Sequence, residues 1–209
     1  MTQMTSLLHF AVFAAALSLT TSSASAQQPI QQPIEDPAGM RADAVNEGLR
    51  LSAGLQLGFA GEASIGGFDA DLDPSFGVQG QVHFPIGRFF LLGGSLAFRS
   101  LKIDGADDRS NVFAVGPSFG GHYAIDVGPV VVDPFVLATI GLAVAFSNDL
   151  QTDTELGIDF GIRGGAHVWF TDRLGAYLAF GYQREDIFID SERSSGWQLH
   201  TDIGVTFSL

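Results

Sequence analysis

Charged side chains that could pair with one another occur at widely separated positions in this chain. Six of them stand in segments where every second residue is apolar, and each falls on the polar side of that alternation. A charge that is buried in a protein interior needs a partner of opposite sign. We therefore predict an interior ion-pair network made of Arg50, Arg99, Arg163, Asp133, Asp159 and Asp202.

Three histidines have the same placement. His83, His122 and His167 each lie on the polar side of a segment, two or three residues before its end. Three converging imidazoles can ligate a transition metal or sense protons, but no spacing motif marks such a site. The chain also has no cysteine and hence no thiolate ligand. We favour hydrogen-bonded interior histidines, and we expect neither a metal nor a cofactor.

Catalysis by a nucleophile would need a serine, a histidine and an acid in one place. His200 could be combined with Ser95 or Ser118, yet the G-x-S-x-G pattern of a nucleophile elbow is absent. Nothing else in the sequence supports the pairing. We predict that the protein is not an enzyme.

A two-residue alternation of apolar and polar residues places these side chains on strands. In the first segment Leu51, Leu55 and Leu57 alternate with Arg50 and Gln56, which a strand would sort onto two faces. The period recurs often enough to predict an all-β chain of eight strands. They lie at about 49–59, 75–85, 89–100, 112–125, 130–146, 156–170, 174–184 and 198–209.

The connections between these segments alternate in length. An even number of strands with short turns at one end and longer loops at the other is typical of bacterial membrane barrels. The sequence therefore predicts an eight-stranded antiparallel up-and-down transmembrane β-barrel. Short connections are expected at 86–88, 126–129 and 171–173, and long ones at about 60–74, 101–111, 147–155 and 185–196.

The sizes of the residues indicate which face points inward. The polar face is rich in Gly, Ser and Gln, which suit a narrow interior, whereas bulky apolar residues suit lipid. A soluble ligand-binding barrel would have the faces reversed. Outward aromatic residues should form two girdles, with Phe84, Phe90, Tyr123, Phe170 and Phe207 near the short turns and Phe59, Phe76, Phe98, Phe113, Phe146 and Tyr182 near the long loops.

The N-terminal part differs in composition from the rest. An apolar run from Leu7 to Leu19 is followed by Ala24-Ser25-Ala26, which reads as a secretory signal peptide cleaved after Ala26. A polar, Pro- and Gln-rich stretch comes next. We predict a signal peptide at 1–26, a flexible periplasmic tail at 27–46 and the barrel at 47–209.

The chain resembles the small outer-membrane barrels of the OmpA and OmpX type, which have a porin-family-like architecture. The resemblance rests on the signal peptide, the eight alternating strands and a last strand that ends Val205-Thr206-Phe207-Ser208-Leu209. The resemblance implies location in the outer membrane of a Gram-negative cell envelope. It also implies contact with outer-membrane lipid and lipopolysaccharide, insertion by the outer-membrane assembly machinery, and a lumen too narrow or too plugged for general solute flux.

The role expected from these features is structural or surface-interacting. One alternative is a narrow channel for small ions or solutes, and another is a lipid-modifying enzyme. A net charge of −13 argues against nucleic acid as a partner, because phosphate contacts need clustered Lys and Arg. The sequence leaves the surface partner unknown.

Overall fold

The computed structural model describes residues 42–209 except 66, 106–108, 148–153 and 190–191. Almost all of this part of the chain is β-strand, as the alternation predicts. The elements are α1 (Ala42–Val45), β1 (Arg50–Ile65), β2 (Phe68–Asp71), β3 (Ser75–Ile86), β4 (Phe90–Leu101), β5 (Ser110–His122), β6 (Ile125–Val127), β7 (Val130–Ser147), β8 (Glu155–Trp169), β9 (Leu174–Ile189) and β10 (Glu192–Ser208).

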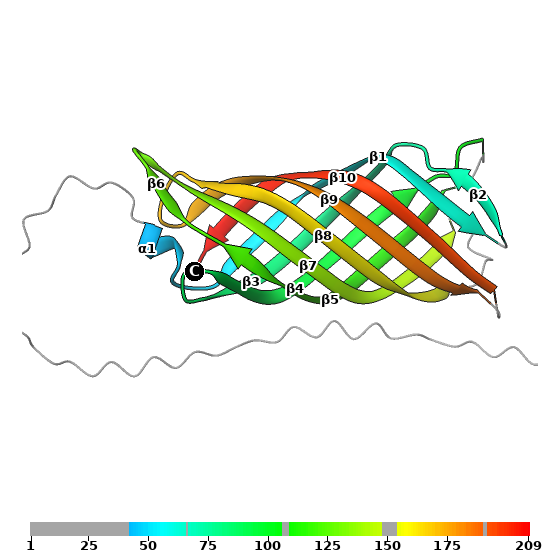
Figure 1. Ribbon diagram of the computed structural model, residues 1–209, viewed down its shortest axis with the longest axis horizontal. Coiled ribbons are helices and arrows are strands. Elements are labelled where there is room, and N and C mark those ends of the chain that lie inside the picture. The colour runs from blue at the N-terminus through cyan, green and yellow to red at the C-terminus, as the bar shows by residue number, and fades with distance from the viewer. Residues whose placement is uncertain (1–41, 66, 106–108, 148–153, 190–191) are drawn as a thin grey trace, which may run out of the picture. The chain divides into compact units, whose positions relative to one another are not determined.

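The eight long strands close into a barrel (Figure 1). Each of them pairs antiparallel with its neighbours in the chain, and β1 completes the ring by pairing with both β3 and β10. The two short strands are additions, since β2 folds back on β1 and β6 pairs with β7. The predicted eight-stranded antiparallel barrel is confirmed.

The two ends of the barrel differ. At one end, called here the turn end, lie α1, the last residue Leu209 and the tight connections 87–89, 128–129 and 170–173 (Figure 1, left). Gly87 and Gly128 have φ values of 64° and 62°, a left-handed conformation that glycine adopts at little cost in a tight turn. The opposite end, called the loop end, carries β2 and the longer connections.

Along the strands, buried and exposed side chains alternate with a period of two residues. In β7, whose alternation is the least regular in the sequence, Asp133, Phe135 and Leu137 are buried in the lumen, whereas Val136 and Ile140 are exposed. The predicted phase of this strand is therefore correct. A strand that closes into a narrow barrel turns every second side chain toward the axis, so the other half must face the surroundings.

The outer surface is apolar along the strands. Nearly all the aromatic residues predicted to face outward are exposed, and Phe98 is partly buried beside Phe146 at a ring distance of 6.3 Å. The exposed ones are Phe84, Phe90, Tyr123, Phe170 and Phe207 toward the turn end, and Phe59, Phe76, Phe113, Phe146 and Tyr182 toward the loop end.

Several boundaries differ from the expectation. Two of the predicted long loops are largely strand, because β1 continues to Ile65 before β2, and β9 and β10 leave only residues 190–191 between them. In these segments polar or small residues interrupt the apolar alternation, as at Gly61-Glu62 of β1 and Arg184-Glu185-Asp186 of β9, although the backbone pairing continues through them.

The predicted tail also ends earlier than expected. Residues 42–45 form α1, and the Val45 side chain is fully buried, so residues 42–46 belong with the barrel rather than with a flexible segment. The predicted signal peptide and the tail up to residue 41 lie outside the described residues. No helix in the described ranges is long and apolar enough to cross a lipid bilayer.

Candidate functional site: the lumen

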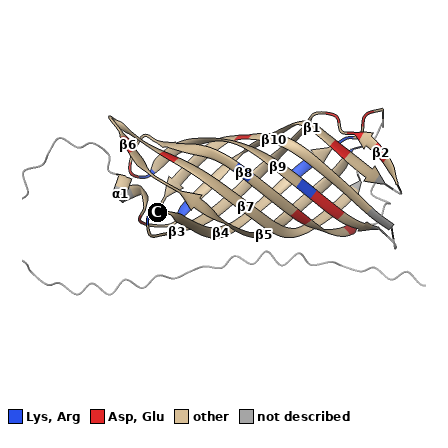
Figure 2. Ribbon diagram, in the orientation of Figure 1, with Lys and Arg blue, Asp and Glu red and all other residues tan. Residues whose placement is uncertain are grey.

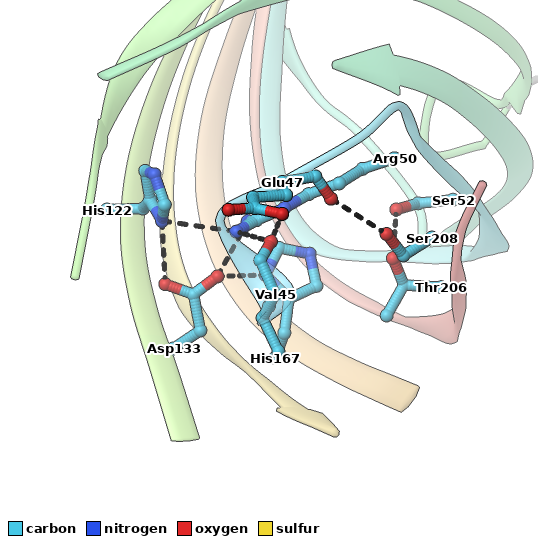
Figure 3. Close-up of polar contacts among 9 residues, drawn as sticks. All are labelled: Val45, Glu47, Arg50, Ser52, His122, Asp133, His167, Thr206 and Ser208. Carbon is cyan, nitrogen blue, oxygen red and sulfur yellow. Dashed lines mark hydrogen bonds and ion pairs between the residues drawn. The ribbon is translucent and has the colours of Figure 1, made fainter. Parts of the chain in front are cut away.

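Arg50 and Asp133 form an ion pair in the lumen at the turn end (Figure 3). Arg50 Nη1 lies 2.6 Å from Asp133 Oδ2, and both side chains are almost fully buried. The same guanidinium donates from Nη2 and Nε to the carbonyl oxygen of Val45, at 2.9 and 3.3 Å. This carbonyl ends the four-residue helix α1, so Arg50 ties α1 to the turn end of the barrel.

Two of the three predicted histidines surround the same carboxylate. His122 Nδ1 lies 2.9 Å from Asp133 Oδ1 and donates a hydrogen bond to it, and His167 Nδ1 lies 3.8 Å from Asp133 Oδ2 (Figure 3). His83 points elsewhere, with Nε2 2.8 Å from the Ser118 hydroxyl. Within the described ranges no group of three or more His, Cys, Asp or Glu side chains is arranged to hold a metal ion.

Aromatic rings fill the lumen beside this cluster. The His167 ring lies 4.5 Å from that of Phe135 and 5.7 Å from that of Tyr177, measured between centroids. The Arg50 guanidinium stands over the Trp169 ring at 5.5 Å, which allows a cation–π interaction. These rings pack beside the Arg50–Asp133 cluster at the turn end of the lumen, where Val45 of α1 packs against Trp169.

A second group of ion pairs lies further along the barrel axis, and each such group is called here an ionic level. Arg163 Nη1 lies 3.6 Å from Asp202 Oδ2 and also donates to the side-chain oxygen of Gln79. Gln79 in turn donates to the Tyr177 hydroxyl at 3.2 Å. His200 Nε2 lies 3.5 Å from the same Asp202 oxygen, so this carboxylate faces two basic groups.

The third level lies toward the loop end. Arg99 Nη2 lies 2.7 Å from Asp159 Oδ1 and 2.9 Å from Glu185 Oε1. Gln183 Nε2 donates to both oxygens of Asp159, at 2.6 and 2.8 Å. One guanidinium is thus shared by two carboxylates, all of them nearly inaccessible to solvent.

The sequence predicts one ion-pair network of six charged residues. In the structure these residues form three ion pairs, Arg50 with Asp133, Arg163 with Asp202, and Arg99 with Asp159. Glu185 was missed, because its strand was expected to end at residue 184. Continuing the period of two from Gln183 would have placed Glu185 inward. The contact of Arg50 with Val45 was also missed, since it depends on α1 and has no signal in the alternation.

The combination of His200 with Ser118 suggested by the sequence does not form. Ser118 contacts His83, and His200 faces Asp202. In the acidic stretch 69–73, Asp73 lies 3.6 Å from the Lys102 ammonium and Asp71 closes the short strand β2. The geometry of the lumen is that of paired, packed charges.

Comparison with known proteins agrees with this architecture. No protein-family model and no curated protein sequence matches the chain. Among solved structures, Neisserial surface protein A matches with 19% identity, a TM-score of 0.50, and coverage of 78% of this chain and 98% of its own. The chain therefore has the fold of a small eight-stranded outer-membrane β-barrel.

Two further barrels match more distantly. The N-terminal β-barrel domain of Pseudomonas aeruginosa OprF has 15% identity and a TM-score of 0.42, with 76% of this chain and 97% of that domain covered. Ail, the attachment invasion locus protein of Yersinia pestis, has 14% identity and a TM-score of 0.36, with 77% and 99% covered.

Proposed function

We propose that this protein is a non-enzymatic integral barrel of the bacterial outer membrane, with a plugged polar lumen and a structural or surface-interacting role. The observation that carries the proposal is the contrast between the two faces of the sheet. Leu96, Leu142 and Phe160 are among the many large apolar residues that face outward, while Arg50, Arg99 and Asp133 are buried inside.

The free-energy cost of exposing the outer apolar surface to water supports a membrane as the surroundings of the barrel. In water, an outer surface with Leu142 68% exposed and Phe90 64% exposed would be an aggregation hazard. In a bilayer the same residues are solvated by lipid chains, and the closed sheet leaves no unpaired strand edge. Outer-membrane lipid and lipopolysaccharide are thus the proposed surroundings, and the outer-membrane assembly machinery the proposed route of insertion.

The packing of side chains inside the barrel supports a role other than transport. Ion pairs at three levels and a layer formed by Phe135, His167 and Trp169 occupy the interior. A buried ion pair opens only at considerable cost, because each charge loses its partner. The loop end then offers the surface available for recognition, and the tight turns face the opposite compartment.

A membrane-folding assay tests the barrel in its proposed setting. The mature chain refolded in detergent should give β-rich circular dichroism and should migrate differently on SDS gels with and without boiling. A chain that instead folds without detergent and stays monomeric in water would contradict the proposal, and would favour a soluble ligand-binding barrel.

A conductance record tests the plug. The refolded protein in a planar bilayer should give no steady single-channel conductance. Reproducible steps would overturn the plugged lumen and favour a narrow channel for small ions or solutes. Lipid mass spectra of expressing cells should be unchanged; modified lipid A or phospholipid would reveal an enzyme.

A further inference from the structure

A cavity of about 190 Å³ lies in the loop half of the lumen and is called here the mouth cavity. Leu101, Val112, Ala145 and Ile187 line it from four different strands. The last three are buried and belong to one apolar cluster, against which Leu101 packs. The apolar wall of the cavity is therefore part of the interior packing of the barrel.

Two further apolar side chains extend this wall beyond the long strands. Leu72 and Ile103 both line the mouth cavity, and an isolated antiparallel bridge joins their backbones. The Leu72 amide also donates a hydrogen bond to the Gly61 carbonyl oxygen of β1 at 2.9 Å. Because backbone hydrogen bonds hold Leu72 in place, the side of the cavity that it forms belongs to the folded structure.

The charged side chains in the lining already have partners. Glu185 Oε1 lies 2.9 Å from Arg99 Nη2, and the Lys102 ammonium lies 3.6 Å from Asp73. Glu155, the other acidic residue of the lining, also has an interaction partner. Figure 2 shows basic as well as acidic positions on the strands of the loop half. A charged ligand would therefore lose its hydration in the mouth cavity without meeting an unpaired opposite charge among the described lining residues.

We propose that the mouth cavity binds a small neutral molecule, a hydrocarbon body of about six to eight carbon atoms that carries one hydroxyl group. The volume sets the size, because an apolar protein cavity of about 150 Å³ is large enough for benzene. The body packs against Val112, Ala145 and Ile187, and the hydroxyl group can form a hydrogen bond with Ser110 or Ser194, which also line the cavity. Mostly apolar walls with a few polar groups are the usual pattern of a small-molecule site. The site does not depend on the role proposed above, since it requires only the folded barrel.

Calorimetric titration of the folded protein in nanodiscs of zwitterionic lipid tests the site. The probe is benzyl alcohol, the matched charged probes of similar size are benzylammonium and benzoate, and empty nanodiscs are titrated to subtract partitioning into lipid. Benzyl alcohol should bind saturably, with one molecule per barrel, and about tenfold more tightly than either charged probe, because only the charged probes lose ionic hydration. Binding of a charged probe as tightly as benzyl alcohol, or no saturation by benzyl alcohol, would overturn the proposal.

Two substitutions locate the bound molecule. Ala145→Phe fills the mouth cavity and should abolish saturable binding of benzyl alcohol. Leu142→Phe introduces the same ring on the outer face of the same strand, where Leu142 is exposed, and should leave binding unchanged. Heat-modifiable migration on SDS gels verifies that each variant is folded. If Ala145→Phe does not fold, Ala63→Phe, which fills the cavity from β1, decides in its place, and unchanged binding in a folded cavity-filling variant rejects the site.

Discussion

The two halves of the lumen differ in the side chains that point inward, with bulky aromatic residues in the turn half and alanines among the inward residues of the loop half. In the turn half, Trp169 lies against the Arg50 guanidinium, Phe135 and Tyr177 pack against His167, and Val45 of α1 is buried against Trp169. In the loop half the inward positions of β7 carry Ala143 and Ala145. These small residues leave room for the mouth cavity, a space of about 190 Å³ that Ala145 and Glu185 line.

The charges follow the same division. At the turn end Arg50 faces one carboxylate and also donates to a backbone carbonyl, so it is fully engaged. Arg99 faces two carboxylates, and one of them lines the mouth cavity. A buried pair in packed surroundings has no substitute for a lost partner, whereas groups beside a cavity can be rehydrated. The turn half should therefore tolerate substitution less well.

Arg50→Met should have the largest effect on stability. It leaves the Asp133 carboxylate and the Val45 carbonyl without their main donor, and removing one partner of a buried ion pair costs about 3–5 kcal/mol. Guanidinium unfolding in lipid vesicles, followed by circular dichroism, measures the loss. The matched control is Arg173→Met in the exposed turn 170–173. A loss below about 1 kcal/mol, the range of exposed pairs, would contradict the importance of this pair.

Arg99→Met should cost less, about 1–3 kcal/mol, because water entering the mouth cavity can hydrate Glu185. The same guanidinium unfolding assay measures the loss of stability, and Arg50→Met, measured under the same conditions, is the reference for comparison. If Arg99→Met proved the more damaging of the two, the loop half would be the better packed region and the comparison would be reversed.

Val45→Ala should have the smallest effect on stability, about 1–2 kcal/mol for the buried methyl groups removed. It should nevertheless loosen the seal at the turn end, because Val45 packs against the fully buried Trp169. Acrylamide quenching of Trp169 in a Trp197→Phe background reports this directly. Quenching should rise in Val45→Ala and stay unchanged in the control Leu51→Ala; unchanged quenching in both would show that α1 is not the seal.

Much of the fold could be predicted because alternation is a local property. The inward phase of Asp133, Arg163 and Asp202 follows from the apolar residues on either side of them. Strand ends were less predictable. In β9, Arg184, Glu185 and Asp186 interrupt the apolar alternation before Ile187 and Phe188 follow, and Glu185 escaped notice for that reason.

The sequence by itself determined the number and order of the eight long strands and the face on which most of their side chains lie, because a period of two can be recognised in consecutive residues. Only the tertiary structure decided the height of each residue along the barrel. Strand tilt and register set that height, and they bring Arg50 of β1 to Asp133 of β7, 83 positions later. They also bring Arg99 between Asp159 and Glu185. On the loop-end side of these residues they leave a cavity, which Ala145 of β7 and Gly196 of β10 help to line.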